Sequence, residues 1–447
     1  MHNMKMIFAI LFTLGVAPSL FSQDTISKKL DELVGAYAKL GKFNGSVIVA
    51  RQGKILMEKG YGFKNFRDST LNSPNTIYQI ASVTKQFTST LVLKLAELKK
   101  LALTDKLSKF YPGLAHGDSI TIENLLTHTS GIIDHYNDSS STPATGTEEE
   151  KLLSTIKKYG LDFSPGTNWH YSNSGYQLLG YIIQRVSNLS YYESVRKYIF
   201  IPLKMDNSAF DFIHLVSKDK ATGYWSFPAN AVAEEATIID SSAPFAAGAI
   251  YSTVEDLYKW HEGLQTYKII SKASLDKAYT PYKNNYGYGW MIDSLYGKCI
   301  IHHSGDIWGF KSDISRITKD DACIVLLNNI EDLDLGVITK KIFSILYNQP
   351  YKLPAKNEIR LSEEIQHKYV GTYEMQPGML IKLTLESGRL MATTDHKEEL
   401  YAQKENNFIA ESGDNQIEIE FVADATGKID NLFFYKNDQK IVCKKIK

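Results

Sequence analysis

The amino-acid sequence predicts an α+β fold, in which an antiparallel sheet flanked by helices precedes a small C-terminal antiparallel β-barrel. Three observations lead to this prediction. Apolar residues recur at helical spacing in several segments between residues 26 and 265, and again over residues 335–347. Residues 291–327 contain consecutive short apolar runs joined by tight turns, which is typical of an antiparallel meander. Beyond residue 363, short strands alternate evenly with Gly, Asn and Asp turns, which indicates a barrel.

The elements before residue 266 follow from local patterns. Apolar stripes predict helices at residues 26–40, 82–100, from residue 175 onward, and 253–265. A hairpin with its turn at Gln52-Gly53 is predicted within residues 45–62. Ser190 and Glu193 have the spacing of a capping box that opens another helix. Residues 137–147 are expected to form an exposed loop. The aperiodic, aromatic residues 205–245 either wall a site or simply pack.

The remaining elements are mostly strands. In the meander, strands are predicted at residues 291–292, 298–302, 310–317 and 322–327. Residues 335–347 are expected to form a closing helix that packs on the sheet with the N-terminal helix. Prolines and charged residues after this helix indicate a linker. In the barrel, strands are predicted at residues 370–374, 380–385, 389–394, 408–410, 417–422, 431–435 and 441–443.

The composition excludes some classes of partner and cofactor. The chain has 447 residues, of which 43% are hydrophobic, and 50 basic residues balance 50 acidic ones. Because the basic residues are scattered, we expect no nucleic-acid partner. The three cysteines form neither a disulfide framework nor a zinc cluster, and we expect them to be small buried residues. His302 and His303 would point to opposite faces of a strand. The sequence therefore predicts neither a metal nor another cofactor.

The N-terminus has the features of a secretory signal peptide. Lys5 is followed by an apolar run over residues 6–16 and by a short polar exit. This run is too short to span a bilayer, which takes about 20 residues. We expect residues 1–22 to be removed, and the mature chain, without a transmembrane segment, to be secreted or periplasmic. The alternative is a buried N-terminal helix.

Ser82 and Lys85 stand at the start of the predicted helix 82–100. Positions i and i+3 share a helix face, so Lys85 Nζ can lie against Ser82 Oγ. A serine hydroxyl becomes a strong nucleophile when a neighbouring base takes its proton, and a helix N-terminus stabilises negative charge. The pattern alone is weak, because it also occurs at Ser154–Lys157, Ser194–Lys197, Ser217–Lys220 and Ser274–Lys277.

Two further motifs follow in order: Tyr171-Ser-Asn173 before a helix and His303-Ser-Gly305 at the end of a strand. Together with Ser82–Lys85 and the surrounding phrases Leu125–Gly131 and Tyr286–Trp290, they resemble the serine β-lactamase and penicillin-binding protein superfamily. The similarity is greatest to the branch of class C β-lactamases, DD-carboxypeptidases and related esterases. It covers about residues 30–347.

This resemblance implies an architecture and a set of domain boundaries. The expected catalytic fold is an antiparallel sheet flanked by helices plus a helical subdomain, with the site between them. Residues 23–348 would form the β-lactamase-related serine hydrolase domain, and residues 349–362 the linker. Residues 363–447 resemble the lipocalin-like domains attached to some relatives. Such a barrel either holds one small ligand or serves as a packed spacer.

The resemblance also implies a reaction. Ser82 would attack a carbonyl and form an acyl-enzyme, with Lys85 and Tyr171 as the base pair. Free lysine and tyrosine both titrate near 10, so their environment must shift at least one pKa. The residues themselves leave open which one is the base. The resemblance favours a phenolate-like Tyr171 with Lys85 as its electrostatic partner. Alone, Tyr171 would be read as a packed aromatic, since the chain has 27 tyrosines.

The other motif residues would bind the substrate. Asn173 would orient Lys85 and the substrate, and His303 and Gly305 would line the binding site. The oxyanion hole is expected from the backbone N–H groups of Ser82 and Asp306. A small residue is usual after this glycine in the family, so the Asp306 carboxylate must point away from the oxyanion. The alternative for His303 is a histidine at a sheet edge.

His303 bears on the substrate. Typical β-lactamases carry Lys-Thr-Gly or Lys-Ser-Gly in the third motif, whereas a histidine is charged only part of the time at neutral pH. We therefore expect a small-molecule or peptide substrate, namely an ester, a D-amino-acid peptide or another amide, and weak or absent β-lactamase activity. The alternatives are a genuine β-lactamase or DD-carboxypeptidase and, in another class, a penicillin-binding sensor that does not turn over.

Overall fold

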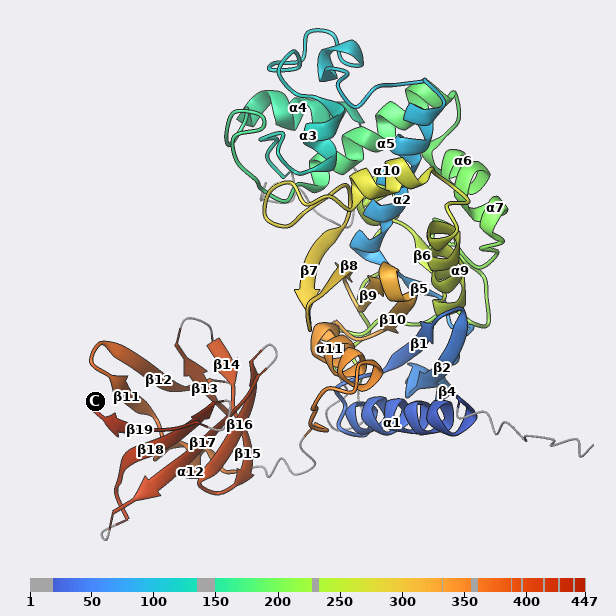
Figure 1. Cartoon of the computed structure of the whole chain (residues 1–447). Helices are drawn as coiled ribbons and strands as arrows, with labels where there is room; N and C mark the ends of the chain where they lie inside the picture. The colour runs from blue at the N-terminus through green and yellow to red at the C-terminus, as the bar shows by residue number, and fades with distance from the viewer. Residues whose placement is uncertain are drawn as a thin grey trace, which may run out of the picture.

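A six-stranded antiparallel sheet in the order β2-β1-β10-β9-β8-β7 forms the centre of the first domain (Figure 1). The structure, a computed structural model, describes residues 19–134, 149–226, 233–331, 333–354, 361–386, 388–394, 397–412, 415–424, 427–436 and 439–446. The strands of the sheet are β1 (Gly45–Arg51), β2 (Lys54–Tyr61), β7 (Met291–Leu295), β8 (Lys298–Ile307), β9 (Phe310–Ile317) and β10 (Ala322–Asn328). The N-terminal hairpin thus joins the later meander through the β1–β10 pair.

The neighbouring strands β1 and β10 are largely apolar because both of their faces are covered. β10 is buried at every position, and β1 is buried at all but its last. Helices α1 (Ser19–Lys39) and α11 (Leu335–Leu346) lie on one face, where Leu33 and Phe343 share a core with Val47 and Leu326 (Figure 1). The helical part of the domain packs on the other face.

Helix α2 (Thr84–Glu97) runs through the helical part and is buried along nearly its whole length. The helices around it are α3 (Ile122–Leu126), α4 (Glu149–Tyr159), α5 (Asn173–Ser187), α6 (Tyr191–Val195), α7 (Ile201–Leu203), α8 (Phe245–Gly248), α9 (Val254–Gln265) and α10 (Lys272–Ala278). The short turns are the 3₁₀ segments η1 (Ala81–Val83), η2 (Leu107–Lys109) and η5 (Thr318–Asp320), and the π-helical η4 (Arg196–Phe200). Two small sheets pair β3 (Phe63–Asn65) with β4 (Thr70–Leu71), and β5 (Tyr78–Gln79) with β6 (Tyr251–Ser252).

The structure confirms the predicted α+β class, and several local signals correspond to the elements found. The hairpin turns at Gln52 and Gly53, which both have positive φ, 54° and 67°. Ser190 and Glu193 form the predicted capping box of α6. Among the described helices, none has both the length and the apolar character that a bilayer span requires.

Several boundaries differ from the sequence prediction. β8 continues to Ile307, so the His303–Gly305 motif lies inside the strand rather than at its end. The helix expected from residue 82 begins with the 3₁₀ turn η1, because α2 starts only at Thr84. Most of the expected signal peptide, residues 1–18, and the loop 137–147 lie outside the described residues. Cys299 is exposed on the edge hairpin β7–β8, so the expectation of a buried residue is wrong for it.

The C-terminal module is a nearly closed nine-stranded barrel in the order β14-β13-β12-β11-β19-β18-β17-β16-β15 (Figure 1). Its elements are α12 (Glu363–His367), β11 (Gly371–Gln376), β12 (Met379–Glu386), β13 (Arg389–Thr393), β14 (Lys397–Glu399), β15 (Tyr401–Lys404), β16 (Asn407–Ser412), β17 (Asn415–Ala423), β18 (Ile429–Lys436) and β19 (Gln439–Lys445). The sequence prediction missed α12, β14 and β15, which are too short for a clear pattern.

Aromatic side chains fill the interior of the barrel. Tyr369 stacks on Phe421 with ring centroids 4.2 Å apart, and Phe408 meets Phe421 edge-on at 5.5 Å. All three are buried. Of the two possibilities left open by the sequence, this packing favours the packed module over a ligand carrier.

Phe421→Ala is expected to destabilise the barrel by about 3–5 kcal/mol, because it leaves a cavity in this aromatic core. All five tryptophans, at positions 169, 225, 260, 290 and 308, lie in the first domain. Urea unfolding should therefore shift when it is followed by far-UV circular dichroism and stay unchanged by tryptophan fluorescence. Val442→Ala, at a residue that is 58% exposed, is the control. An equal shift of the tryptophan signal would contradict independent folding of the two units.

Candidate active site

Ser82 lies in the 3₁₀ turn η1, directly before α2. The preceding residue, Ala81, has φ 46°, in the left-handed region that non-glycine residues seldom adopt. β8 holds this turn in place from the sheet side. A Cβ on Gly305 would lie 2.3 Å from the carbonyl oxygen of Ile80, and Ser312 Oγ donates a hydrogen bond to that oxygen at 2.7 Å. The glycine of the third motif is therefore required for β8 to approach the serine turn.

Lys85 is fully buried, and its amine is surrounded by three oxygen atoms. Nζ donates to Ser82 Oγ at 3.0 Å, to Asn173 Oδ1 at 2.8 Å and to the carbonyl oxygen of Ala247 at 2.8 Å. Burial lowers the pKa of Lys85 to about 7, although the charge of Asp134 opposes this shift. In the neutral amine, two N–H groups serve Asn173 and Ala247, and the lone pair faces the Ser82 hydroxyl. The arrangement is that of a base directed at Ser82.

Asn173, the first residue of α5, is oriented by Asp134. Its backbone N–H and its Nδ2 both donate to Asp134 Oδ2, at 3.1 and 2.8 Å. Because the amide nitrogen is committed to this carboxylate, the amide oxygen is turned to Lys85. Asp134 is buried, and the sequence analysis gave it no role. In the sequence, only its position shortly after the family-like stretch Leu125–Gly131 pointed to Asp134.

Tyr171 lies beside the same amine. Its ring centroid is 4.8 Å from Lys85 Nζ. Burial raises the pKa of Tyr171 well above its usual range, and the hydrogen bond with Ser82 opposes this only in part. Tyr171 therefore keeps its proton at neutral pH, whereas Lys85 loses its own readily. Burial therefore favours Lys85 as the base over the phenolate-like Tyr171 that the family resemblance implied.

His128 packs against the ring of Tyr171. Its ring centroid lies 4.4 Å from that of Tyr171 and 4.6 Å from that of Tyr286. His128 Nδ1 accepts the backbone N–H of Ser172, the N-cap residue of α5, at 3.1 Å. The loop that contains His128 is thereby tied to the Tyr171–Asn173 motif. The sequence identified this loop as part of the family resemblance but indicated no role for His128 itself.

His303 is buried, and its contacts favour the neutral ring. Its Nδ1 lies 2.6 Å from the carbonyl oxygen of Ser304, which can only accept, so Nδ1 carries the proton and Nε2 accepts from Tyr286 Oη at 3.0 Å. Burial and the charge of Lys85 lower the pKa of His303 to about 3. Whereas the sequence led us to expect partial charge at neutral pH, these surroundings favour the neutral ring.

A cavity of about 370 Å³ lies in front of Ser82. Its lining comprises Ala81, Ser82, Asn173, Ile239, Pro244, Ala247, Gly248, Asp306, Ile307, Trp308 and Glu331. Both charged residues of this lining, Asp306 and Glu331, are acidic. His303 is not part of it. Ile239 and Pro244 come from the aperiodic segment 205–245. The sequence left open whether this segment walls a site, and these two residues line the cavity.

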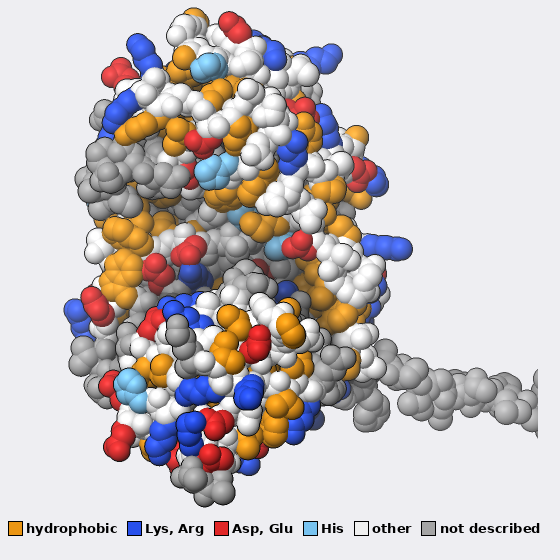
Figure 2. Space-filling view, turned by 90° about the vertical axis from the view of Figure 1, so that its left-hand side faces the viewer, with side chains coloured by type: hydrophobic (Ala, Val, Ile, Leu, Met, Phe, Trp, Pro, Cys, Tyr) orange, Lys and Arg blue, Asp and Glu red, His pale blue; other side chains and the backbone are white. Residues whose placement is uncertain are grey.

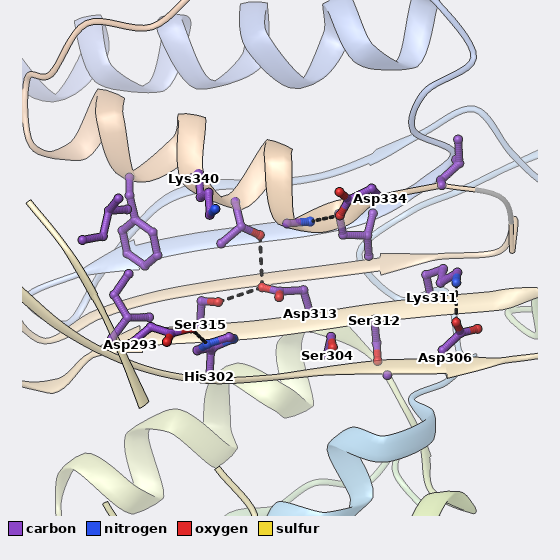
Figure 3. A pocket seen from close by; sticks show the side chains of 18 of the residues that line it. Asp293, His302, Ser304, Asp306, Lys311, Ser312, Asp313, Ser315, Asp334 and Lys340 are labelled. Atoms are coloured by element: carbon purple, nitrogen blue, oxygen red, sulfur yellow. Dashed lines mark hydrogen bonds and ion pairs between the residues drawn. The ribbon is translucent and has the colours of Figure 1, made fainter. Parts of the chain in front are cut away.

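The two residues expected to supply the oxyanion hole, Ser82 and Asp306, line this cavity together. The Asp306 carboxylate pairs at 2.5 Å with Lys311, its partner across the β8–β9 ladder (Figure 3). The positive charge of Lys311 thus compensates the negative charge of the Asp306 carboxylate. A backbone N–H at this position can serve a developing oxyanion without the carboxylate opposing it.

Comparison with known proteins gives matches over both parts of the chain. The beta-lactamase family model matches residues 28–346, and a model described as a domain of unknown function (DUF3471) matches residues 355–445. Penicillin-binding protein 4* of Bacillus subtilis (strain 168) is 28% identical over 431 residues, which cover 88% of this chain and 93% of that protein.

Solved structures share the fold. The octameric penicillin-binding protein homologue from Pyrococcus abyssi superposes with a TM-score of 0.69 at 24% identity, covering 93% of this chain and 99% of the other. The D-amino acid amidase from Ochrobactrum anthropi SV3 superposes with a TM-score of 0.64 at 20% identity, covering 72% of this chain and 99% of the other.

The lowered pKa of Lys85 predicts a pH dependence. If the neutral amine is the base, kcat/KM for a nitrophenyl ester should rise through an apparent pKa near 7 and level off above it. Lys85→Ala should lower kcat/KM by about 100- to 10,000-fold. Lys94→Ala, on the same helix, is the control and should keep the wild-type profile. A rate that rises only near pH 10 would contradict this account and point to an unperturbed lysine or tyrosine.

Proposed function

The chain belongs to the beta-lactamase family, and from that premise we propose that it is a serine hydrolase that works through an acyl-enzyme on Ser82. The proposed substrate is an ester, a D-amino-acid peptide or another amide. The observation that carries the proposal is the position of the Lys85 amine, which lies 3.0 Å from Ser82 Oγ and is held by two further acceptors. A buried lysine whose pKa is near 7 can take the serine proton at neutral pH.

The reaction follows from these contacts. The Ser82 proton passes to Lys85 Nζ while Oγ attacks the substrate carbonyl carbon. The backbone N–H groups of Ser82 and Asp306 stabilise the oxyanion. Tyr171 then donates its proton to the leaving oxygen or nitrogen and regains one from Lys85, so the site returns to its starting charge. Water attacks the acyl-enzyme in the second half-reaction, which releases the acid and frees Ser82.

The charges near Ser82 support the choice of substrate. The third motif carries a His303 whose surroundings favour the neutral ring where typical β-lactamases carry a lysine, and the described lining of the cavity contains neither lysine nor arginine. A carboxylate, which β-lactams and DD-peptides both bear, would therefore meet no cation among the described lining residues. A neutral or cationic acyl group fits this cavity better. The fold shared with a D-amino acid amidase is compatible with amide substrates.

We further propose that the protein acts outside the cytoplasm after removal of residues 1–22. Lys5, the apolar run and the polar exit of the N-terminal segment support this location. The expected domain limits remain residues 23–348 for the hydrolase, 349–362 for the linker and 363–447 for the barrel, whose lipocalin-like character is part of the proposal.

Intact mass spectrometry tests the nucleophile. Incubation with a fluorophosphonate should add one phosphonyl group to the wild-type protein, because the activated Ser82 hydroxyl attacks phosphorus and displaces fluoride. Ser82→Ala should stay unmodified, and Ser154→Ala, in another Ser-x-x-Lys pattern, should react like the wild type. Adduct on Ser82→Ala would contradict the assignment, as would an unreactive wild type with both the fluorophosphonate and a penicillin.

Comparison of two chromogenic substrates ranks the activities. A neutral nitrophenyl ester should be hydrolysed with a kcat/KM at least about 100-fold above that of a chromogenic cephalosporin, since His303 supplies no charge for the carboxylate. Efficient cephalosporin turnover would favour the β-lactamase alternative. A stable penicillin adduct without turnover of either substrate would favour the sensor.

A further inference from the structure

A second cavity, of about 760 Å³, lies on the face of the sheet that α11 only partly covers (Figure 3). Its floor is formed by β7, β8 and β9, and its upper wall by α11, which contributes Leu335, Thr339 and Phe343. We call it the rear cavity. The side of the molecule that faces left in Figure 1 is hollowed, with acidic side chains along the walls of the hollow (Figure 2).

The ladder register directs neighbouring side chains of β8 and β9 to opposite faces of the sheet, and Asp306 and Glu331 line both cavities. Ser304 pairs with Asp313 across β8 and β9, and both point into the rear cavity. Their neighbours Gly305 and Ser312, which also pair, approach the serine turn on the other face. One strand, β8, therefore contributes to both sites from its two faces.

Asp313 is the group that marks the rear cavity as a binding site. It is only 5% exposed, and its Oδ1 accepts both of its hydrogen bonds, from Ser315 Oγ at 2.9 Å and Thr339 Oγ1 at 3.0 Å. Among the described residues, none donates a hydrogen bond to Oδ2. Burial raises the pKa of this carboxyl group, and the hydrogen bonds from Ser315 and Thr339 act in the opposite direction. Oδ2 therefore faces the rear cavity, where an ammonium group can donate a charge-assisted hydrogen bond to it.

The other charged groups of the lining have partners. Asp306 pairs with Lys311 at 2.5 Å, and Asp293 pairs with His302 at 2.8 Å. Asp334 accepts the N–H of Gly336 at the start of α11. The carboxylates of the lining outnumber its lysines, so the cavity as a whole favours a positive charge.

A metal ion does not fit this set of groups. Among the described residues, three potential ligand atoms of His, Cys, Asp or Glu gather within 4.8 Å only at His261, Glu262 and Asp321, which lie elsewhere. The rear cavity instead combines the single open carboxylate oxygen with apolar walls, to which Leu295, Ile300 and the α11 residues contribute. An organic cation matches both features.

We propose that the rear cavity binds a small primary ammonium compound with an apolar body. The ammonium group would donate to Asp313 Oδ2 and to the hydroxyl of Ser304, and the body would pack on Leu335 and Phe343. This site does not rest on the proposed hydrolase reaction, because none of the four residues that would bind the ligand, Asp313, Ser304, Leu335 and Phe343, takes part in that reaction. The competing interpretation is the solvated outer face of an antiparallel sheet, which binds nothing.

Isothermal titration of the full chain with phenethylammonium chloride tests the proposal, with 2-phenylethanol as a neutral analogue of the same shape. The wild type should bind the ammonium compound at least about tenfold more tightly than the alcohol, because only the former pairs with Asp313. Asp313→Asn keeps an acceptor for Ser315 and Thr339 and should weaken ammonium binding by at least about tenfold. Asp276→Asn, on exposed α10, removes the same charge and should bind like the wild type.

Equal binding of the ammonium compound and the alcohol would overturn the proposal, as would wild-type affinity in Asp313→Asn. Failure of the wild type to bind phenethylammonium, n-pentylammonium or cyclohexylmethylammonium would also overturn it. Circular dichroism establishes whether Asp313→Asn is folded. If it is not, Ser304→Leu serves as the second variant, because an apolar branch opposite Asp313 should abolish binding while the carboxylate stays in place.

Discussion

The burial of the Lys85 amine is the interaction on which the rest of the catalytic site depends. A fully buried ammonium is costly, and here three oxygen atoms from η1, α5 and α8 reduce that cost without supplying a full countercharge. The remaining imbalance lowers the pKa of Lys85 to about 7. Asp134 orients Asn173, the Tyr171 ring lies beside Nζ, and His128 packs on Tyr171.

Strand β8 connects the chemistry to the architecture. Gly305 brings the strand against the serine turn, and the neighbouring Asp306 contributes its backbone to the same cavity. Alternation along the strand sends His302 and Ser304 to the opposite face. β1 and β10 are largely apolar and covered by helices, whereas β7, β8 and β9 carry polar residues on the face that α11 only partly covers. Across one sheet, one face thus borders the catalytic site, and the partly covered face forms the floor of the rear cavity.

Much of the fold and of the candidate site could be predicted from the sequence, because short-range patterns determine these features. The i, i+3 spacing brings Ser82 and Lys85 together, and the capping signal of Ser190 and the Gln52-Gly53 turn depend only on neighbours. The contact between Asn173 and Asp134 could not be predicted, since it joins residues 39 positions apart whose spacing follows no local period. The charge state of His303 was equally inaccessible, because it depends on burial by Tyr286 and on the nearby lysine. The shortest barrel strands, β14 and β15, gave too little pattern to detect.

The proposed reaction depends most directly on the protonation of the Lys85 amine, so titration of this group is the decisive measurement. NMR of the protein labelled with ¹³C at lysine Cε, with the resonance assigned by its loss in Lys85→Arg, follows this amine without reference to any substrate. The structure predicts a midpoint near 7 for this resonance, while exposed lysines titrate at about 10.4. A Lys85 midpoint at or above 10 would contradict the account, because the amine would then be an ammonium at neutral pH and could not accept the proton of Ser82.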